Sequence, residues 1–126
     1  MISIVDDDGT VREATADLVG ALGYQTRTFA SGEAFLESGQ LEQTSCLITD
    51  IQMPGLNGLE LQSRLLAAGC QIPVIFITAF PTAAARQQAM SAGAVAFLSK
   101  PFEEASLIQS LAAALAQFEA KACGAT

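Results

Sequence analysis

Apolar and polar positions along the chain follow two alternating periodicities, and the alternation repeats five times. Short apolar or β-branched runs, typical of strands, occupy residues 2–5, 25–29, 46–49, 74–77 and 95–98. A segment with helical signals follows each run, and in the first of them apolar side chains recur every three or four residues, as in an amphipathic helix. The predicted helices lie at residues 11–22, from Ser31 to Gly39, from Asn57 through Leu65, at 82–92 and at 107–118.

Polar caps mark the starts of two of these helices. Ser31 is a good N-cap for a short helix. Asn57, followed three residues later by Glu60, forms a near capping box. Gly23 and Gly93 follow the last positions of their helices, where glycine is typical of a C-terminus.

Five strands that alternate with five helices predict an α/β fold. We expect a doubly wound five-stranded parallel sheet with helices on both faces, in three α/β/α layers. The run Val74–Ile77 is almost wholly apolar, as expected for a strand covered on both sides. The 126 residues, 51% hydrophobic and 15% charged, are enough for one domain with its own core and too few for two.

Charge and residue usage exclude several classes of function. Thirteen acidic and six basic side chains give a net charge of -7, so we expect no nucleic acid and no membrane as a direct partner. The chain has no histidine, which excludes Ser-His-Asp and Cys-His nucleophiles, histidine-ligated metals and a phosphohistidine within the chain. Three cysteines form no CxxC pair, and no targeting segment or bilayer-length apolar run is visible, so a cytoplasmic protein is expected.

Five polar residues fall where predicted strands end. Asp6 and Asp7 follow the first strand, Asp50 the third, Thr78 the fourth and Lys100 the fifth. The carboxyl ends of parallel strands meet at one edge of the sheet, where ligands of such folds bind, so these side chains are expected to lie together. Two carboxylates ~4 Å apart repel by roughly 4 kcal/mol at an effective dielectric near 20, and either a proton or a divalent cation must relieve this repulsion.

Oxygen ligands without histidine or thiolate favour Mg²⁺, which prefers phosphate as a further ligand. Neither GxxxxGK[ST] nor GxGxxG occurs, so no loop is predicted to cradle a whole nucleotide. A lone phosphoryl group remains, with a carboxylate as its covalent acceptor and Lys100 and Thr78 as donors to its oxygens.

Four segments carry a resemblance to a known family: Ile4–Asp8, Thr49–Gly58, Ile77–Ala79 and Leu98–Phe102. In this order and spacing they resemble the receiver domain of two-component response regulators, with its flavodoxin-like (CheY-like) fold. Ala92–Ala94 together with the last segment is similar to the branch that usually carries a LuxR-type helix-turn-helix output domain. The resemblance implies strand order 2-1-3-4-5 and a receiver domain at residues 1–120, with 121–126 as a frayed tail or the start of a linker.

The resemblance also implies a role for each acid at the sheet edge. Asp50 would be the phosphoacceptor and a metal ligand, Asp7 a direct Mg²⁺ ligand, and Asp6 a ligand through water. The backbone carbonyl of Gln52 would be the third protein ligand. Gln52 and Phe80 stand where other residues are frequent in the family, which bears on the lifetime of the phospho-aspartate.

A switch and its partners are implied in the same way. Thr78 would bond a phosphoryl oxygen, Lys100 would pair with the phosphoryl group or Asp50, and Phe97 would be the switch aromatic, although it also suits an ordinary core position. The Lys100–Pro101 bond is commonly cis in the family. The partners implied are a sensor histidine kinase and, on phosphorylation, a homodimer through the fourth helix, fifth strand and fifth helix. The domain would be no enzyme beyond self-directed phosphotransfer and autodephosphorylation.

Two other functions compete with this interpretation. Asp6–Thr10 also fits DxDGT, the nucleophile motif of haloacid-dehalogenase-like phosphatases, which need a further acidic pair late in the chain. After Asp50 the chain has no aspartate, and its only glutamates there are Glu60, Glu103, Glu104 and Glu119. The second alternative is a pseudo-receiver that acts only as an interaction module.

Overall fold

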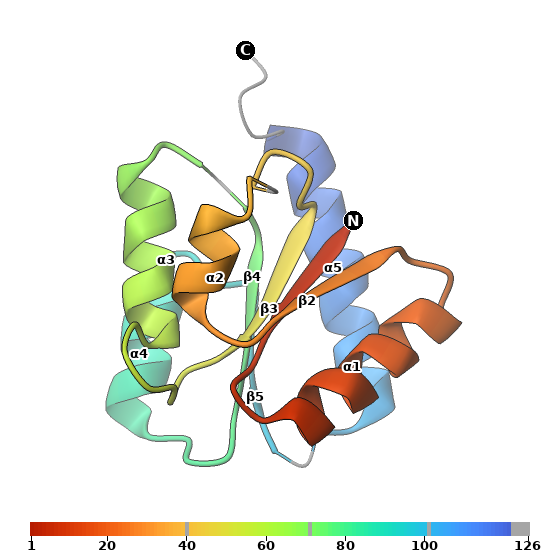
Figure 1. Ribbon diagram of the computed structural model, residues 1–126, viewed down its shortest axis with the longest axis horizontal. Coiled ribbons are helices and arrows are strands. Elements are labelled where there is room, and N and C mark those ends of the chain that lie inside the picture. The colour runs from red at the N-terminus through yellow and green to blue at the C-terminus, as the bar shows by residue number, and fades with distance from the viewer. Residues whose placement is uncertain (40, 71, 101, 122–126) are drawn as a thin grey trace.

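The structure is a computed structural model that describes residues 1–39, 41–70, 72–100 and 102–121, the last four by their backbone only. Strands and helices alternate through the described residues (Figure 1). The strands are β1 (Ile2–Val5), β2 (Thr26–Phe29), β3 (Cys46–Asp50), β4 (Val74–Thr78) and β5 (Ala96–Ser99). The helices are α1 (Gly9–Ala21), α2 (Gly32–Glu37), α3 (Gly58–Ala67), α4 (Ala83–Ser91) and α5 (Glu104–Lys121).

All four strand pairings are parallel, and the sheet order is β2-β1-β3-β4-β5. Figure 1 shows α1 and α5 on one face of this sheet and α2, α3 and α4 on the other. The predicted three-layer, doubly wound fold with strand order 2-1-3-4-5 is therefore confirmed. The order reverses between β1 and β3, so the carboxyl ends of these two strands flank the crevice where such folds bind ligands.

The core has two parts because neighbouring strand residues point to opposite faces of the sheet. Val5, Leu47 and Phe76 belong to the cluster under α2, α3 and α4. Ile4 and Ile48 belong to the cluster under α1 and α5. Strands β1, β3 and β4 are buried throughout, which explains why their sequences are mostly apolar rather than alternating.

Helices α1 to α4 begin at side-chain caps. Ser31 accepts a hydrogen bond from the backbone N–H of Ala34, and Asn57 and Glu60 form the complete capping box, as predicted. Asp8 caps α1, which therefore starts at Gly9 rather than at residue 11. Thr82 lies just outside α4 as its N-cap.

Two elements near the C-terminus are displaced from their predicted bounds. Strand β5 is shifted by one residue, because the Val95 N–H bonds to the Val74 carbonyl before the ladder begins. Helix α5 begins at Glu104, one turn before the predicted start at Leu107. Its first turn lacks large apolar side chains, so periodicity does not detect it, whereas an acidic residue there suits the helix dipole.

None of the helices in the described ranges combines the length and the hydropathy needed to cross a bilayer. Cys46 and Cys70 are both buried, and burial raises the pKa of the Cys46 thiol to about 12, so this thiol stays protonated and unreactive near neutral pH. The predicted cis bond before Pro101, the third cysteine Cys123 and the tail at 122–126 lie outside the described residues. The domain boundary at residue 120 stays a prediction.

Candidate functional site

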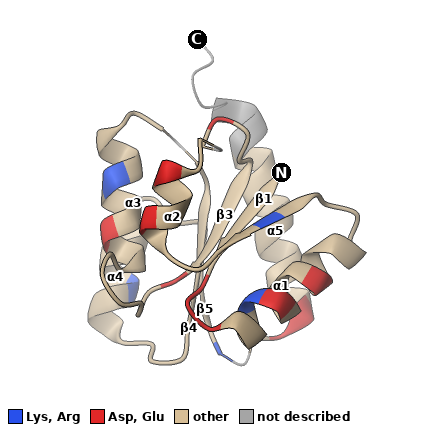
Figure 2. Ribbon diagram, in the orientation of Figure 1, with Lys and Arg blue, Asp and Glu red and all other residues tan. Residues whose placement is uncertain are grey.

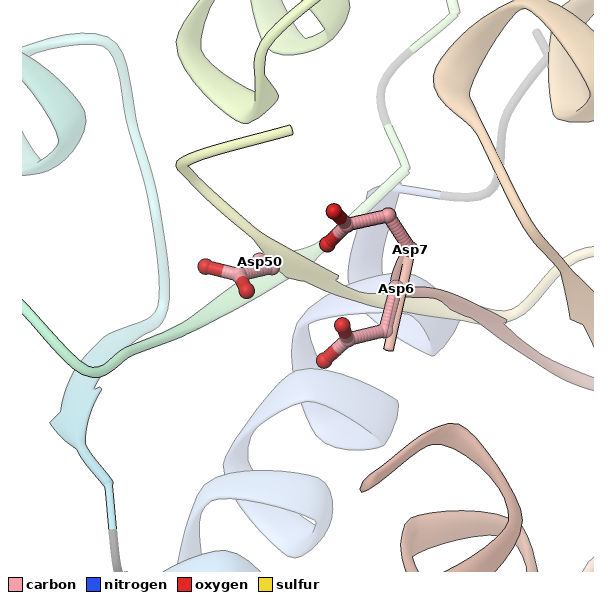
Figure 3. A group of neighbouring side chains, drawn as sticks. All are labelled: Asp6, Asp7 and Asp50. Carbon is pink, nitrogen blue, oxygen red and sulfur yellow. The ribbon is translucent and has the colours of Figure 1, made fainter. Parts of the chain in front are cut away.

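Three carboxylates from two strand ends meet at one edge of the sheet. Asp50 is the last residue of β3, and Asp6 and Asp7 directly follow β1, its neighbour in the sheet. One oxygen from each side chain lies within 4.8 Å of the others (Figure 3). Asp6 and Asp50 are 4% and 7% exposed, whereas Asp7 is exposed to solvent. The structure thus brings together the acids that the sequence placed at strand ends.

Lys100 joins the two buried carboxylates. Its Nζ lies 2.9 Å from Oδ2 of Asp50 and 3.0 Å from Oδ2 of Asp6. Its backbone N–H bonds to the Thr78 carbonyl at 2.8 Å, which anchors the residue to the end of β4. Burial on its own lowers the pKa of Lys100, but the hydrogen bonds to Asp50 and Asp6 outweigh it and raise the pKa above the ordinary lysine value. The ammonium group therefore stays charged throughout the physiological range.

Asp6 is held as a desolvated carboxylate. Burial raises its pKa, while the Asp8 N–H, 2.9 Å from Oδ1, and the Lys100 ammonium act in the opposite direction. The net shift is upward because burial outweighs these two contacts, and the negative charge of Asp50 adds a smaller upward contribution to the pKa of Asp6. A second cation beside Asp6 would relieve this cost.

The Asp50 side chain is fixed at both oxygens. Its Oδ1 accepts the backbone N–H groups of Ile51 at 2.7 Å and Gln52 at 3.3 Å, and its Oδ2 accepts Lys100. Because these bonds satisfy Oδ1 within the β3–α3 loop, Oδ2 is the oxygen that faces the other charges. An oriented carboxylate of this kind is a suitable acceptor for group transfer.

The loop after Asp50 is held close to the end of β3 by α3. The Gly58 N–H donates to the Ile51 carbonyl at 2.9 Å, and a Cβ at Gly58 would lie only 2.2 Å from the Asp50 carbonyl oxygen. Gly55 has a φ of 74°, which favours glycine, and the Glu33 carboxylate lies beside it. Gln52 is exposed in this loop, next to the acids. The glycines of this segment therefore set the position of the phosphoacceptor candidate.

Thr78 and Phe97 lie on the neighbouring strands β4 and β5. Thr78 is fully buried at the end of β4, and its Oγ1 accepts the Phe80 N–H at 3.2 Å. Phe97 is half-buried, pairs with Phe76 in the sheet register and packs against the cluster under α2, α3 and α4. Since side chains two residues apart share a sheet face, Thr78 and Phe97 lie on the same face. Phe80, whose N–H bonds to Thr78, is 66% exposed.

The charges of the site do not cancel. Three carboxylates and one ammonium leave a formal charge of -2 at the edge where β1 and β3 end. Figure 2 shows the acidic segments in red at the ends of these two strands. At the separation of the three oxygens, each carboxylate pair repels by at least about 3.5 kcal/mol at an effective dielectric near 20. The site is thus suited to a divalent cation with oxygen ligands, which would offset the excess negative charge.

Sequence reasoning missed three residues that shape this site. Asp8 could have been found, because an acid just before a helical segment is a typical N-cap. The closeness of Gly58 to Asp50 and the contact of Arg12 with the Asp6 carbonyl are tertiary features that no local pattern indicates.

Known proteins of one family match nearly the whole chain. The family model described as "Response regulator receiver domain" matches residues 2–112. Response regulator protein TmoT of Ectopseudomonas mendocina is 42% identical over 116 residues, which cover 91% of this chain and 52% of that protein. Transcriptional regulatory protein FixJ of Azorhizobium caulinodans is 38% identical over 114 residues, which cover 90% of this chain and 54% of that protein. The chain thus spans about half the length of these relatives.

Solved structures agree with the sequence matches. Response regulator StyR superposes with a TM-score of 0.84 at 40% identity, over 95% of this chain and 61% of that one. FixJ-N superposes with a TM-score of 0.82 at 34% identity, over 91% of this chain and 92% of that one. The match extends from the first strand into the last helix and includes the acidic edge. The chain belongs to the response regulator receiver domain family.

Proposed function

We propose that this receiver domain accepts a phosphoryl group on Asp50 from the phosphohistidine of a sensor histidine kinase, in a Mg²⁺-dependent reaction in the cytoplasm. The observation that carries the proposal is the placement of Asp50: a fixed carboxylate with one oxygen 2.9 Å from Lys100 and two further acids beside it. The domain acts as a signalling element, and its only chemistry is phosphotransfer to itself and loss of that group by hydrolysis.

Transfer requires a bond between Oδ2 of Asp50 and phosphorus to form as the phosphorus–nitrogen bond of the donor breaks. The electron pair of that bond leaves with the imidazole of the donor. Lys100 supplies positive charge to the phosphoryl oxygens in the transition state. Thr78 uses its oxygen to accept from Phe80, so its hydroxyl proton is available for a phosphoryl oxygen.

The residues at this edge fit a magnesium ion. The candidate ligands are Asp7, Asp50, the Gln52 backbone carbonyl and, through water, Asp6. All offer oxygen, and the uncompensated charge of -2 with the raised pKa of Asp6 favours a cation. Bound Mg²⁺ would neutralise the acids and the incoming phosphoryl oxygens.

The metal assignment predicts unequal losses in two variants. Asp7→Ala removes a direct, solvent-facing ligand, and we expect Mg²⁺ affinity to fall by at least about tenfold, or ~1.4 kcal/mol. Asp6→Ala should lower it less, since its contact is through water. Amide shifts in an NMR titration with Mg²⁺ measure both. Asp17→Ala, an exposed acid on α1, is the control, and wild-type affinity in Asp7→Ala would contradict the assignment.

The structure disfavours the phosphatase alternative. Asp8, the third acid of the DxDGT match, is used as the N-cap of α1 and accepts the N–H groups of Thr10 and Val11. Among the described residues, the only acidic group arranged to hold a metal is Asp6, Asp7 and Asp50. The proximity of Asp50 to Lys100, Asp6 and Asp7 supports a phosphoacceptor rather than a pseudo-receiver.

The phosphoryl group is proposed to act on a partner surface through Thr78 and Phe97. A phosphoryl oxygen would draw the Thr78 hydroxyl toward Asp50, and Phe97, on the same sheet face, could then turn inward. This changes the surface of α4, β5 and α5, where Met90 and Ile108 are 40% and 42% exposed. The relatives named as transcriptional regulators are about twice as long, which supports an output domain after the receiver at residues 1–120.

This switch predicts a change of mass in solution. With beryllofluoride and Mg²⁺, sedimentation of the wild type should shift from monomer toward a symmetric dimer, because ~1–3 kcal/mol of coupling changes an equilibrium constant by about 5- to 150-fold. Thr78→Ala should lose most of the shift. Thr28→Ala, an exposed position on β2, should keep it. An unchanged mass with NMR shifts confined to the acidic site would show that the coupling is absent.

A further inference from the structure

The β1–α1 loop carries a cationic contact that the transfer chemistry does not use. Nη1 of Arg12 donates to the backbone carbonyl of Asp6 at 2.7 Å. Arg12 comes from the first turns of α1, is half-buried, and its Nη2 would lie 3.4 Å from a Cβ at Gly9. The guanidinium group therefore lies across the loop and holds the residue that precedes Asp7.

Asp6 makes two further hydrogen bonds, one through its side chain and one through its backbone N–H. The Asp8 N–H donates to Oδ1 of Asp6 at 2.9 Å, and the Asp6 N–H donates to the Phe29 carbonyl at 3.2 Å. The Asp8 carboxylate in turn caps α1, and its carbonyl accepts the Arg12 N–H at 2.9 Å. Among the described residues, Arg12 provides the one side-chain donor to the Asp6 carbonyl, so it completes this closed set of bonds.

We propose that Arg12 is a positioning residue for the metal site: its bond to the Asp6 carbonyl holds the Asp6 and Asp7 carboxylates in their metal-binding orientation. The inference rests on the proposed Mg²⁺ site. A charged donor to a backbone carbonyl is among the stronger hydrogen bonds, and 2.7 Å is short for an N–H donor. Partners that orient metal ligands typically change metal affinity by about 10- to 100-fold when removed.

Positioning and simple electrostatics predict opposite effects of removing Arg12. A guanidinium group near a divalent cation repels it, so loss of the charge alone would strengthen Mg²⁺ binding. Loss of the bond to the Asp6 carbonyl frees the loop and would weaken Mg²⁺ binding. The sign of the change therefore separates the two roles.

The test is Mg²⁺ titration followed by NMR in Arg12→Met, Arg12→Gln and Arg12→Lys. We expect about tenfold weaker binding in the two uncharged variants and substantial recovery in Arg12→Lys, whose ammonium group can donate to the same carbonyl. Arg27→Met removes an exposed arginine from β2 and should bind Mg²⁺ like the wild type. Mg²⁺ affinity equal to or above wild type in a folded uncharged variant overturns the proposal.

A second measurement needs no metal. In the metal-free protein, hydrogen exchange of the Asp8 amide should be faster in the uncharged variants than in the wild type, because its acceptor on Asp6 is no longer held. Unchanged exchange overturns the role of Arg12. Failure of the wild type itself to bind Mg²⁺ would instead refute the proposed metal site, while the exchange measurement still decides whether Arg12 orients Asp6.

Discussion

Asp50→Asn is expected to abolish labelling of the protein by acetyl phosphate and by a phosphorylated kinase. The amide keeps an oxygen for the Ile51 and Gln52 N–H groups, so the loop after β3 should retain its conformation. It removes the carboxylate oxygen beside Lys100, and a neutral amide is a poor nucleophile toward phosphorus. Intact-mass spectrometry with and without Mg²⁺ measures the added phosphoryl group.

The matched control for this change is Asp17→Asn. Asp17 lies exposed on α1, so the same chemical replacement there should leave labelling at the wild-type level. Lys100 still pairs with Asp6 in Asp50→Asn, and loss of one of three clustered negative charges relieves repulsion, so stability should not fall. Wild-type labelling of a folded Asp50→Asn protein would refute Asp50 as the acceptor.

The sheet and most of the candidate site could be predicted from the sequence because both depend on short-range patterns. Apolar runs marked the strands, and in a parallel sheet the residue after each strand falls at a common edge. Asp6, Asp50 and Lys100 were therefore expected to lie together. In the structure, both carboxylates are within hydrogen-bond distance of the Lys100 ammonium group. What this reasoning left open was the partner of Lys100, which bonds to both buried acids rather than to Asp50 alone.

Other features could not be predicted because they arise where segments meet in space. The start of α5 at Glu104 is polar, and the one-residue shift of β5 is set by its pairing with β4. Arg12 reaches a backbone carbonyl, a group that every residue offers, so no residue type in the sequence indicates the contact. Likewise, the capping box at Asn57 and Glu60 indicated the start of α3 but not the close approach of this helix to the strand.

That close approach predicts a large loss of stability in Gly58→Ala. The new Cβ would lie 2.2 Å from the Asp50 carbonyl oxygen and 3.0 Å from Cα of Ile51, and both are backbone atoms that a side-chain rotation cannot move. Separation of the two segments would break the 2.9 Å bond from the Gly58 N–H to the Ile51 carbonyl. We expect a net loss of about 2–3 kcal/mol in the free energy of unfolding, even after the better helix propensity of alanine.

Gly20→Ala is the matched control, because Gly20 lies within α1 and a Cβ there meets nothing within 4 Å. It should raise the free energy of unfolding by roughly 0.5–1 kcal/mol in urea denaturation followed by circular dichroism. In Gly58→Ala, the fraction of the protein that still folds should also be phosphorylated more slowly, because the new Cβ strains the backbone of Asp50 itself. Equal stability of Gly58→Ala and wild type, with Gly20→Ala behaving as expected, would show that the loop can move away from α3 without cost.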